Sequence, residues 1–525
     1  MRTEFHLSGY VALALAAAVA TAGIAASGTA VRATTATWTG GGGSGNTNWS
    51  DTANWSGGSG TGGIPGTGDT VDFGTSTSLT SNNDLSALSI GELLFGYPAN
   101  GPDAFTLTGN SLTVTTTGLN SGYGIYANGT ATETINNDVA FSGSSDVREA
   151  SSGTIVLNGT ITGTDNFVLN AGSGAIVLDD TSGGADTFTG GLTGINGIID
   201  LKAGNYTFEG TSNYGLQGTV NMTGGSLTLG SSSSATIQNE TNIYNVSGGT
   251  LAYNGFYRGA GDTTVNIGGN LTVDDTSGFG TRISTDNYSG SLTLAGGSAT
   301  FSGNTITVND AASTDVGTIN LNSGTLTTPG LAFNSSTSGT AVINSDGGTL
   351  EFSAADTIAA STAATWNVLA GGSVINTDGN NVTIDQALVS DATADGGLTK
   401  NGLGTLNLAS TANTYNGNTT VNAGTLEINS NFLASTSTVS IAAGALMDLN
   451  YSSTVTDIVK ALYLNGVSQG AGVYGAGHLG STYFSGTGTL TVQGSEIPEP
   501  ATLALMASAG VGLLTIKRRK NIGSL

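Results

Sequence analysis

The chain has 525 residues, of which 36 are Asp or Glu and only 12 are Lys or Arg, so its net charge is −24. Phosphate binding needs basic surface, so this charge excludes nucleic acid as a natural partner. The sequence holds no cysteine, so its stability must come without disulfides. A charged fraction of 9% with 38% hydrophobic residues argues against charge-driven disorder.

Residues 1–33 are predicted to form a signal peptide. Arg2 precedes an apolar segment from Tyr10 to Ala26, and small residues follow it, as in a secretory signal that is removed after export. A retained N-terminal anchor is the alternative. Both interpretations predict that the bulk of the chain leaves the cytoplasm.

Residues 34–80 are predicted to form an N-terminal cap rich in tryptophan. Trp38, Trp49 and Trp55 are three of the four tryptophans in the chain. A repetitive fold needs a cap at its open end, and large apolar rings suit that role. The alternative is a glycan-binding surface, because exposed aromatic rings can stack on sugar rings.

Residues 81–460 carry a repeated phrase, in which small residues led by glycine precede an apolar–polar–apolar triplet. Examples begin at Gly224, Gly248, Gly347, Gly404 and Gly424. The alternation marks short half-buried strands, and the glycines mark turns. Leu227 and Leu251 are 24 residues apart, and Leu406 and Leu426 are 20 apart, which suits one coil of a solenoid. The sequence therefore predicts an all-β fold, a right-handed parallel β-helix or solenoid; a string of β-sandwiches is the alternative.

The stretch 397–429 of this body has a more specific pattern. It opens with Gly397-Leu398-Thr399-Lys400-Asn401-Gly402 and runs through Asn413-Thr414-Tyr415-Asn416-Gly417 to Gly424-Thr425-Leu426. It resembles the autotransporter-associated β-strand repeat of β-helical passenger domains, and the resemblance implies secretion and surface display. Beyond the body, residues 461–495 are predicted to cap the second end of the solenoid.

The final stretch, 497–520, contains three sequence features in order: a proline motif, an apolar run and a basic cluster. Pro498 and Pro500 flank Glu499 and forbid regular helix. An uncharged apolar run from Ala501 to Ile516 follows, and its length approaches that of a membrane span. Four consecutive cations then predict a cytoplasmic end; they are Lys517, Arg518, Arg519 and Lys520. A buried C-terminal helix is the alternative.

In this order the tail resembles a PEP-CTERM sorting signal, which exosortases process in Gram-negative bacteria that make exopolysaccharide. The resemblance implies an exosortase-type partner that recognises Pro498-Glu499-Pro500. It also implies a single C-terminal transmembrane helix that anchors the protein in transit. The expected destination is the cell surface, the outer envelope or the extracellular matrix.

Enzyme chemistry could rest on two adjacent carboxylate pairs, Asp179-Asp180 and Asp274-Asp275, because glycoside hydrolysis needs only two carboxyl groups. Asn376-Thr377-Asp378-Gly379 resembles a pectinase motif, but the motifs that accompany it there do not follow in the same order. An anionic sugar would require clustered cations, and those between residues 33 and 497 are dispersed: Arg148, Lys202, Arg258, Arg282, Lys400 and Lys460.

We therefore assign no catalytic, cofactor-binding or metal-binding residue. The hypothesis from sequence is a secreted, surface-sorted structural or adhesive solenoid of the cell envelope or exopolysaccharide matrix, with exopolysaccharide or other surface components as partners. The alternative is a polysaccharide-degrading β-helix enzyme, either a lyase or a glycosidase.

Overall fold

The computed structural model of the protein describes residues 34–493. Short gaps within that range lie at 44, 98–102, 116–120, 144, 211, 231–234, 260–262, 276–280, 285–287, 310–313, 335–338 and 392–393. Regular structure in the described residues is almost entirely β-strand, apart from two short 3-10 turns, η1 (Thr52–Asn54) and η2 (Ser481–Tyr483). The predicted signal peptide and C-terminal helix both lie outside the described residues.

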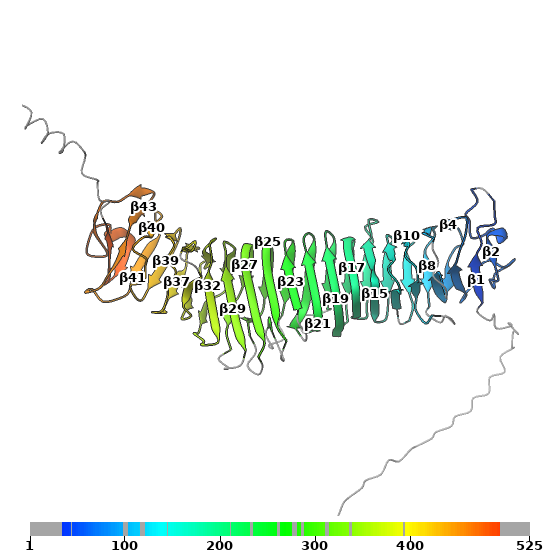
Figure 1. Ribbon diagram of the computed structural model, residues 1–525, viewed down its shortest axis with the longest axis horizontal. Helices are drawn as coiled ribbons and strands as arrows, with labels where there is room; N and C mark the ends of the chain where they lie inside the picture. The colour runs from blue at the N-terminus through cyan, green and yellow to red at the C-terminus, as the bar shows by residue number, and fades with distance from the viewer. Residues whose placement is uncertain are drawn as a thin grey trace, which may run out of the picture. The chain divides into compact units, whose positions relative to one another are not determined.

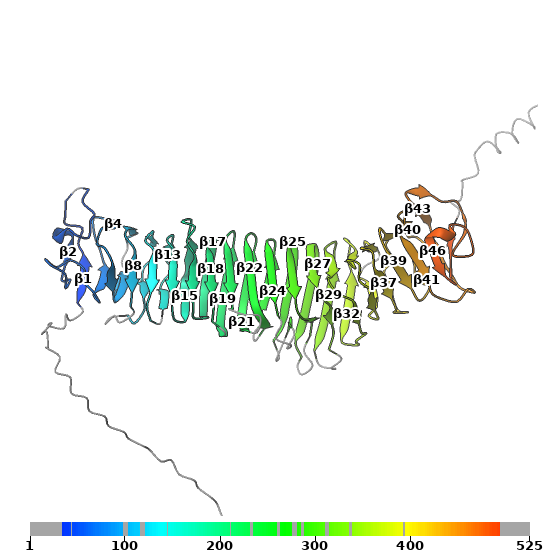
Figure 2. The ribbon, with the colours of Figure 1, turned by 180° about the vertical axis from the view of Figure 1, so that it is seen from behind.

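The strands form three parallel ladders, here called faces 1, 2 and 3, and successive strands in each ladder come from successive coils of the chain. Figure 1 and Figure 2 show the coils side by side along the described body. This arrangement is a right-handed parallel β-solenoid. It confirms the predicted all-β class and solenoid, and its parallel pairing contradicts the alternative of β-sandwiches, whose sheets are antiparallel.

Face 1 begins at the N-terminal end and pairs one short strand per coil with the next. Its first strands are β1 (Thr35–Trp38), β3 (Thr70–Phe73), β6 (Glu92–Phe95), β9 (Ile125–Ala127) and β12 (Ser145–Glu149), followed by parts of β15, β17, β19, β21 and β22. Beyond the isolated bridge between Arg282 and Thr307, the later strands are β26 (Ile306–Thr307), β28 (Leu331–Ala332), β31 (Asp356–Ile358), β34 (Val382–Ile384), β37 (Thr405–Leu408), β39 (Thr425–Ile428), β41 (Leu446–Leu449) and β46 (Phe484–Gly486).

Face 2 adjoins face 1 and includes the longest strands, which run through a corner and so serve two faces. Its strands are β4 (Thr80–Asn83), β7 (Thr106–Gly109), β10 (Thr132–Ile135), β13 (Thr154–Leu157), β15 (Phe167–Asp179), β17 (Leu192–Ala203), β19 (Ser212–Met222), β21 (Ala235–Val246), β23 (Thr263–Ile267), β25 (Gly290–Ser302), β27 (Val316–Thr328), β29 (Thr340–Ser345), β32 (Ala364–Val368) and β35 (Leu388–Ser390).

Face 3 is continuous from the first coils to the C-terminal cap. Its strands are β5 (Leu88–Ile90), β8 (Leu112–Val114), β11 (Val139–Phe141), β14 (Ile161–Gly163), β16 (Asp186–Phe188), β18 (Asn205–Phe208), β20 (Ser226–Leu229), β22 (Thr250–Gly259), β24 (Asn270–Asp274), parts of β25 and β27, β30 (Thr349–Phe352), β33 (Ser373–Asn376), β36 (Leu398–Asn401), β38 (Thr419–Val421), β40 (Thr438–Ile441) and β43 (Ala461–Leu464).

The interior is filled by ladders of like side chains. In-register pairing places Ile176 on Ile199, and the same line continues through Val220 and Tyr244 toward Ile319. Alternation along each strand supplies these ladders, because every second residue points inward. The triplet in the repeated phrase therefore predicted the core correctly: Leu227, Leu251, Leu406 and Leu426 are all buried.

The N-terminal end carries a cluster of aromatic rings. β2 (Trp55–Ser56) pairs antiparallel with β1, and the rings of Trp38, Trp49 and Trp55 are all buried. Trp55 lies edge-on to Trp38 at 5.0 Å and to Trp49 at 5.1 Å. Burial removes these rings from solvent, which does not suit the alternative of a sugar-stacking surface. β1 already pairs in parallel with β3, and Trp38 lies in β1. The aromatic cluster therefore includes a residue of the first coil.

The C-terminal end departs from the coil pattern. β42 (Thr456–Val459) pairs parallel with β47 (Thr489–Val492), which pairs antiparallel with β45 (Gly472–Tyr474). β44 (Val467–Ser468) folds back on β43 as a hairpin. These strands lie within the predicted cap at 461–495 and the coil before it.

Candidate functional site

The residues predicted for sorting and membrane insertion lie outside the described part of the chain. They are Pro498, Glu499, Pro500, Lys517, Arg518, Arg519 and Lys520. Among the residues that are described, no helix is both long and apolar enough to span a membrane. The sorting signal and the transmembrane helix therefore stay predictions.

The two adjacent carboxylate pairs are each divided between the interior and the outside. Asp180 is buried and accepts hydrogen bonds from the Ser182 backbone N–H at 2.7 Å and the Thr160 hydroxyl at 3.1 Å. Its neighbour Asp179 is only half-buried. Glycoside hydrolysis requires two carboxyl groups that face the same sugar, whereas here Asp180 is buried and Asp179 is half-buried at the end of β15.

The second pair behaves in the same way. Asp274 is exposed and accepts a hydrogen bond from the Ser302 hydroxyl at 2.9 Å, whereas Asp275 is buried and accepts one from Thr281 at 3.5 Å. In the motif at 376–379, Asp378 occupies a turn with φ of 46° and donates its backbone N–H to the Asn376 side chain at 3.0 Å. These contacts are those of turn residues.

Other buried carboxyl groups link neighbouring coils. Glu133 accepts the backbone N–H of Phe105 at 2.8 Å, and Asp186 accepts that of Ile161 at 2.6 Å. Burial raises the pKa of each carboxyl group to about 7. Asp457 binds the Leu433 N–H and the Tyr451 hydroxyl, both at 2.9 Å, and burial raises its pKa to about 6. These raised pKa values are compatible with a structural role, because each of the three carboxyl groups accepts a hydrogen bond from a backbone N–H of a neighbouring coil.

Lys400 lies inside the solenoid, and its place in the repeated pattern predicts this position. Its ammonium donates to the carbonyl oxygens of Gly402 at 2.7 Å, Asn401 at 2.8 Å and Ala423 at 3.2 Å, and to the Thr377 hydroxyl at 3.0 Å. The side chain is fully buried, and burial lowers its pKa to about 8. The sequence indicates this position because Lys400 is two residues after Leu398 in β36, so alternation places both side chains on the inward side of the strand.

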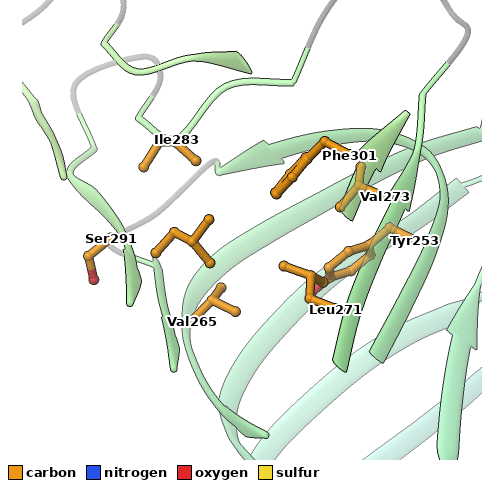
Figure 3. Close-up of a pocket in the computed structure, with 8 residues that line it drawn as sticks. Tyr253, Val265, Leu271, Val273, Ile283, Ser291 and Phe301 are labelled. Carbon is orange, nitrogen blue, oxygen red and sulfur yellow. The ribbon is translucent and has the colours of Figure 1, made fainter. Parts of the chain in front are cut away.

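No described residues form a group of three or more His, Asp or Glu side chains that could hold a metal ion. One small interior void of about 10 Å³ lies beneath β22–β25 and is lined almost entirely by apolar side chains, including Tyr253, Val265, Leu271 and Phe301 (Figure 3). An apolar void of this size stays empty. It is a packing gap and not a ligand site.

Face 2 presents an amide row on its outer surface. The side-chain N–H of Asn221 donates to Asp200 at 2.8 Å, that of Asn245 to Asn221 at 2.9 Å, and that of Asn266 to Asn245 at 2.9 Å. The line continues on later coils through Thr293, Asn320, Asn344 and Asn367, at 2.8 to 3.0 Å. These bonds fix the amide planes at the strand spacing, about 4.8 Å per coil.

Face 3 presents two neighbouring hydroxyl rows on its outer surface. Register pairing aligns one row through Asn205, Ser226, Thr250, Asn270, Ser298 and Thr325, and a second row through Thr207, Thr228, Ala252, Thr272, Thr300 and Thr327. Threonine is restricted at χ1, so many of these hydroxyls are held in few orientations. Over these coils the two rows are uncharged and repetitive, with polar groups at a fixed spacing.

The fold and these rows define the described chain as a parallel β-solenoid with polar outer ladders. A protein-family model described as Passenger-associated-transport-repeat matches residues 398–428. The match spans β36 to β39 and confirms the resemblance predicted for 397–429. It covers only a small part of the chain. Comparison with curated proteins and with solved structures finds no match.

Proposed function

We propose that this protein is an exported, surface-associated structural or adhesive solenoid of the cell envelope or exopolysaccharide matrix. The observation that carries the proposal is the set of polar rows on faces 2 and 3, which consist mainly of amide and hydroxyl side chains and repeat on coil after coil. The solenoid and its passenger-associated repeat support export and display, since both are typical of passenger domains.

Binding in this proposal is the sum of many weak contacts. A single hydroxyl or amide contributes little, because it exchanges water for another hydrogen-bond partner. A repeating polymer can contact many coils at once, and linked weak contacts raise the overall affinity by orders of magnitude. The rows are neutral apart from Asp200 at the start of the face 2 row, and the whole chain carries a charge of −24, so neutral polymers are favoured over anionic ones.

The test compares binding with turnover. Purified full-length protein would be sedimented with exopolysaccharide from the producing cells, and reducing ends would be counted in the same samples. We expect affinity to rise steeply with polymer length and no new reducing ends. Turnover that Asp179→Asn or Asp274→Asn abolishes would establish the enzyme alternative, and absence of any polymer binding would contradict the adhesive role.

The proposed route to the surface is sorting by an exosortase through the tail. Deletion of residues 498–520 removes the Pro498-Glu499-Pro500 motif, the apolar run and the cations together. We expect the truncated protein to be released into the medium or retained in the periplasm, as measured by cell fractionation. Unchanged surface retention would contradict the sorting proposal and leave the binding proposal intact.

A further inference from the structure

A groove of about 370 Å³ lies at the C-terminal end of face 3. It is lined by Thr420, Asn422, Ser440, Ile441, Ala442, Tyr463 and Gly466. Every one of these side chains is uncharged, and the volume falls in the range of small-ligand sites. The groove is separate from the carboxyl groups, the buried lysine and the interior void described above.

The register of three coils builds the floor of this groove. Parallel pairing places Thr420 beside Ser440, and Ser440 beside Tyr463. These three residues are therefore consecutive members of one outward row, in which the last hydroxyl is replaced by a phenol ring. The same pairing places Ile441 beside Leu464, whose side chain is buried beneath the groove.

A tight hairpin holds Tyr463 in place. β43 and β44 are joined by Asn465 and Gly466, with φ of 49° and 76°, as expected for an Asn-Gly hairpin turn with positive φ at both positions. The Asn465 N–H donates to the Ile441 carbonyl at 2.8 Å, which ties the turn to the preceding coil. Tyr463 is paired with Ser468 across the hairpin and remains 38% exposed.

An amide row leads into the same groove from the repeat that matches the family model. Asn376 and Asn401 are register partners, and the Asn422 side-chain nitrogen donates to the Asn401 side-chain oxygen at 2.9 Å. That bond orients the Asn422 amide and leaves a second N–H on the same nitrogen. Fixed amides beside an aromatic face provide both a hydrogen-bonding edge and an apolar platform.

We propose that this groove binds a neutral sugar unit of a polysaccharide, with Tyr463 stacked on the apolar face of the sugar ring. Asn422, Thr420 and Ser440 supply hydrogen-bond partners for its hydroxyl groups. Pyranose rings are uncharged, present C–H groups on one face and hydroxyls at their edges, and so match this lining. This proposal rests on the proposed polysaccharide-binding function and says where on the solenoid the polymer binds. Either the chain end of the polymer or an internal unit occupies the groove, and the flanking units follow the rows of face 3.

The test uses short neutral sugars, because these contact far fewer coils than the full polymer does. Hexasaccharides of glucose, mannose and N-acetylglucosamine would be titrated into the purified full-length protein, with a galacturonate hexasaccharide as the anionic comparison. We expect at least one neutral hexasaccharide to bind and the anionic one not to bind. We expect Tyr463→Ala to weaken that binding by about tenfold, and Tyr463→Phe and Tyr463→Trp to retain it.

Tyr288→Ala is the matched control, since Tyr288 is 43% exposed and lies outside the groove lining. It should bind as the unaltered protein does, and circular dichroism should show all variants folded. Equal binding by Tyr463→Ala and the unaltered protein would overturn the site, as would preference for the anionic sugar. If long polymer sediments with the protein but no hexasaccharide binds, the groove proposal fails while the proposed function stands.

Discussion

The tryptophans at the N-terminal end of the solenoid and Tyr463 at the C-terminal end lie in opposite environments. At the N-terminal end, Trp49 and Trp55 are buried against Phe73, with ring centroids 6.1 and 6.0 Å from it. At the C-terminal end, Tyr463 is exposed and forms one side of a groove. Tyr474 and Phe484 are buried at the C-terminal end as well, so aromatic side chains stabilise both ends, and Tyr463 differs from them in offering a binding surface.

Strand parity accounts for this difference. In β1, Trp38 shares the inward side with Ala36. In β43, Leu462 and Leu464 take the inward positions, so Tyr463 between them must point outward. An aromatic residue near the end of a solenoid thus says little about its role until its place in the alternation is known.

The ionisable groups inside the solenoid differ between the N-terminal coils and the coils of the matched repeat. The N-terminal coils bury carboxyl groups, such as Glu133 and Glu149, whereas the coils of the matched repeat bury Lys400. Burial disfavours the charged form in both cases. The N-terminal coils should therefore lose stability as the pH rises, and the environment of Lys400 should gain it.

The largest expected effect is at the buried N-terminal rings. Trp49→Ala removes a fully buried ring whose N–H donates to the Ser81 hydroxyl, and such truncations cost about 3–5 kcal/mol. Hydrogen exchange at β1 and β3 should accelerate, because end coils depend on their neighbours. Tyr463→Ala is the comparison at the other end and should leave exchange in β43 nearly unchanged. Equal effects of the two variants would show that Trp49 and Tyr463 contribute alike to the stability of their coils.

The sequence predicted the repeated elements of this molecule better than its special positions. The alternation around Leu406 and Leu426 and the spacing of the glycines were enough to predict the coils, because a repeated pattern must place like residues on like sides. The repeat at 397–429 was recognised for the same reason. The coils and the matched repeat could both be predicted because each depends on the order of residues that are close together in the sequence.

The special positions depend on contacts between coils, which the sequence does not state. Long strands such as β25 pass through a corner, so the triplet on one side of Gly296 belongs to a different face from the triplet on the other. The groove requires Tyr463, Ser440 and Thr420 to align across three coils of unequal length. Without the structure, the sequence does not show that the spacings of 20 and 23 residues between these positions are the ones that bring them into register.

The second largest effect is expected at the buried lysine. Lys400→Met removes the donor that satisfies three backbone carbonyls and the Thr377 hydroxyl, and we expect a loss of about 3 kcal/mol at pH 7. The lowered pKa of about 8 also means that the unfolded chain holds this proton more tightly. Stability of the unaltered protein should therefore rise from pH 8 toward the ordinary lysine pKa of 10.5.

Urea unfolding of both proteins between pH 7 and 10 would measure this slope. Lys400→Met should lack the rise that the unaltered protein shows. Lys460→Met is the control, because Lys460 is exposed, and it should change neither the stability at pH 7 nor the slope. A variant at position 400 that keeps the full slope would show that another group titrates.

A smaller effect is expected where two coils approach closely within the matched repeat. A Cβ atom on Gly404 would lie 1.6 Å from the carbonyl oxygen of Asn380, so Gly404→Ala must push two coils apart at a cost of about 2 kcal/mol. Gly477→Ala in the C-terminal cap is the control, because nothing lies within 4 Å of its Cβ position. Thermal unfolding should separate the two, and a neutral Gly404→Ala would mean that the coils are not packed at this distance.

The smallest effect is expected at the N-terminal carboxyl groups, where the sign of the pH dependence reverses. The pKa of Glu133 is raised from 4.5 to about 7 by burial, so the folded state binds its proton more tightly than the unfolded chain. The contribution of Glu133 to the free energy of unfolding is therefore fully present below pH 4.5 and is lost as the pH rises through 7.

The variant Glu133→Gln tests this contribution. Its side chain keeps an oxygen that can accept the Phe105 N–H, and it cannot ionise. We expect it to match the unaltered protein at pH 4 and to be more stable than the unaltered protein at pH 8 in urea unfolding. Glu209→Gln, at an exposed position, should shift neither value, and a Glu133→Gln protein less stable at pH 8 would show that the carboxylate form is favoured inside the coil.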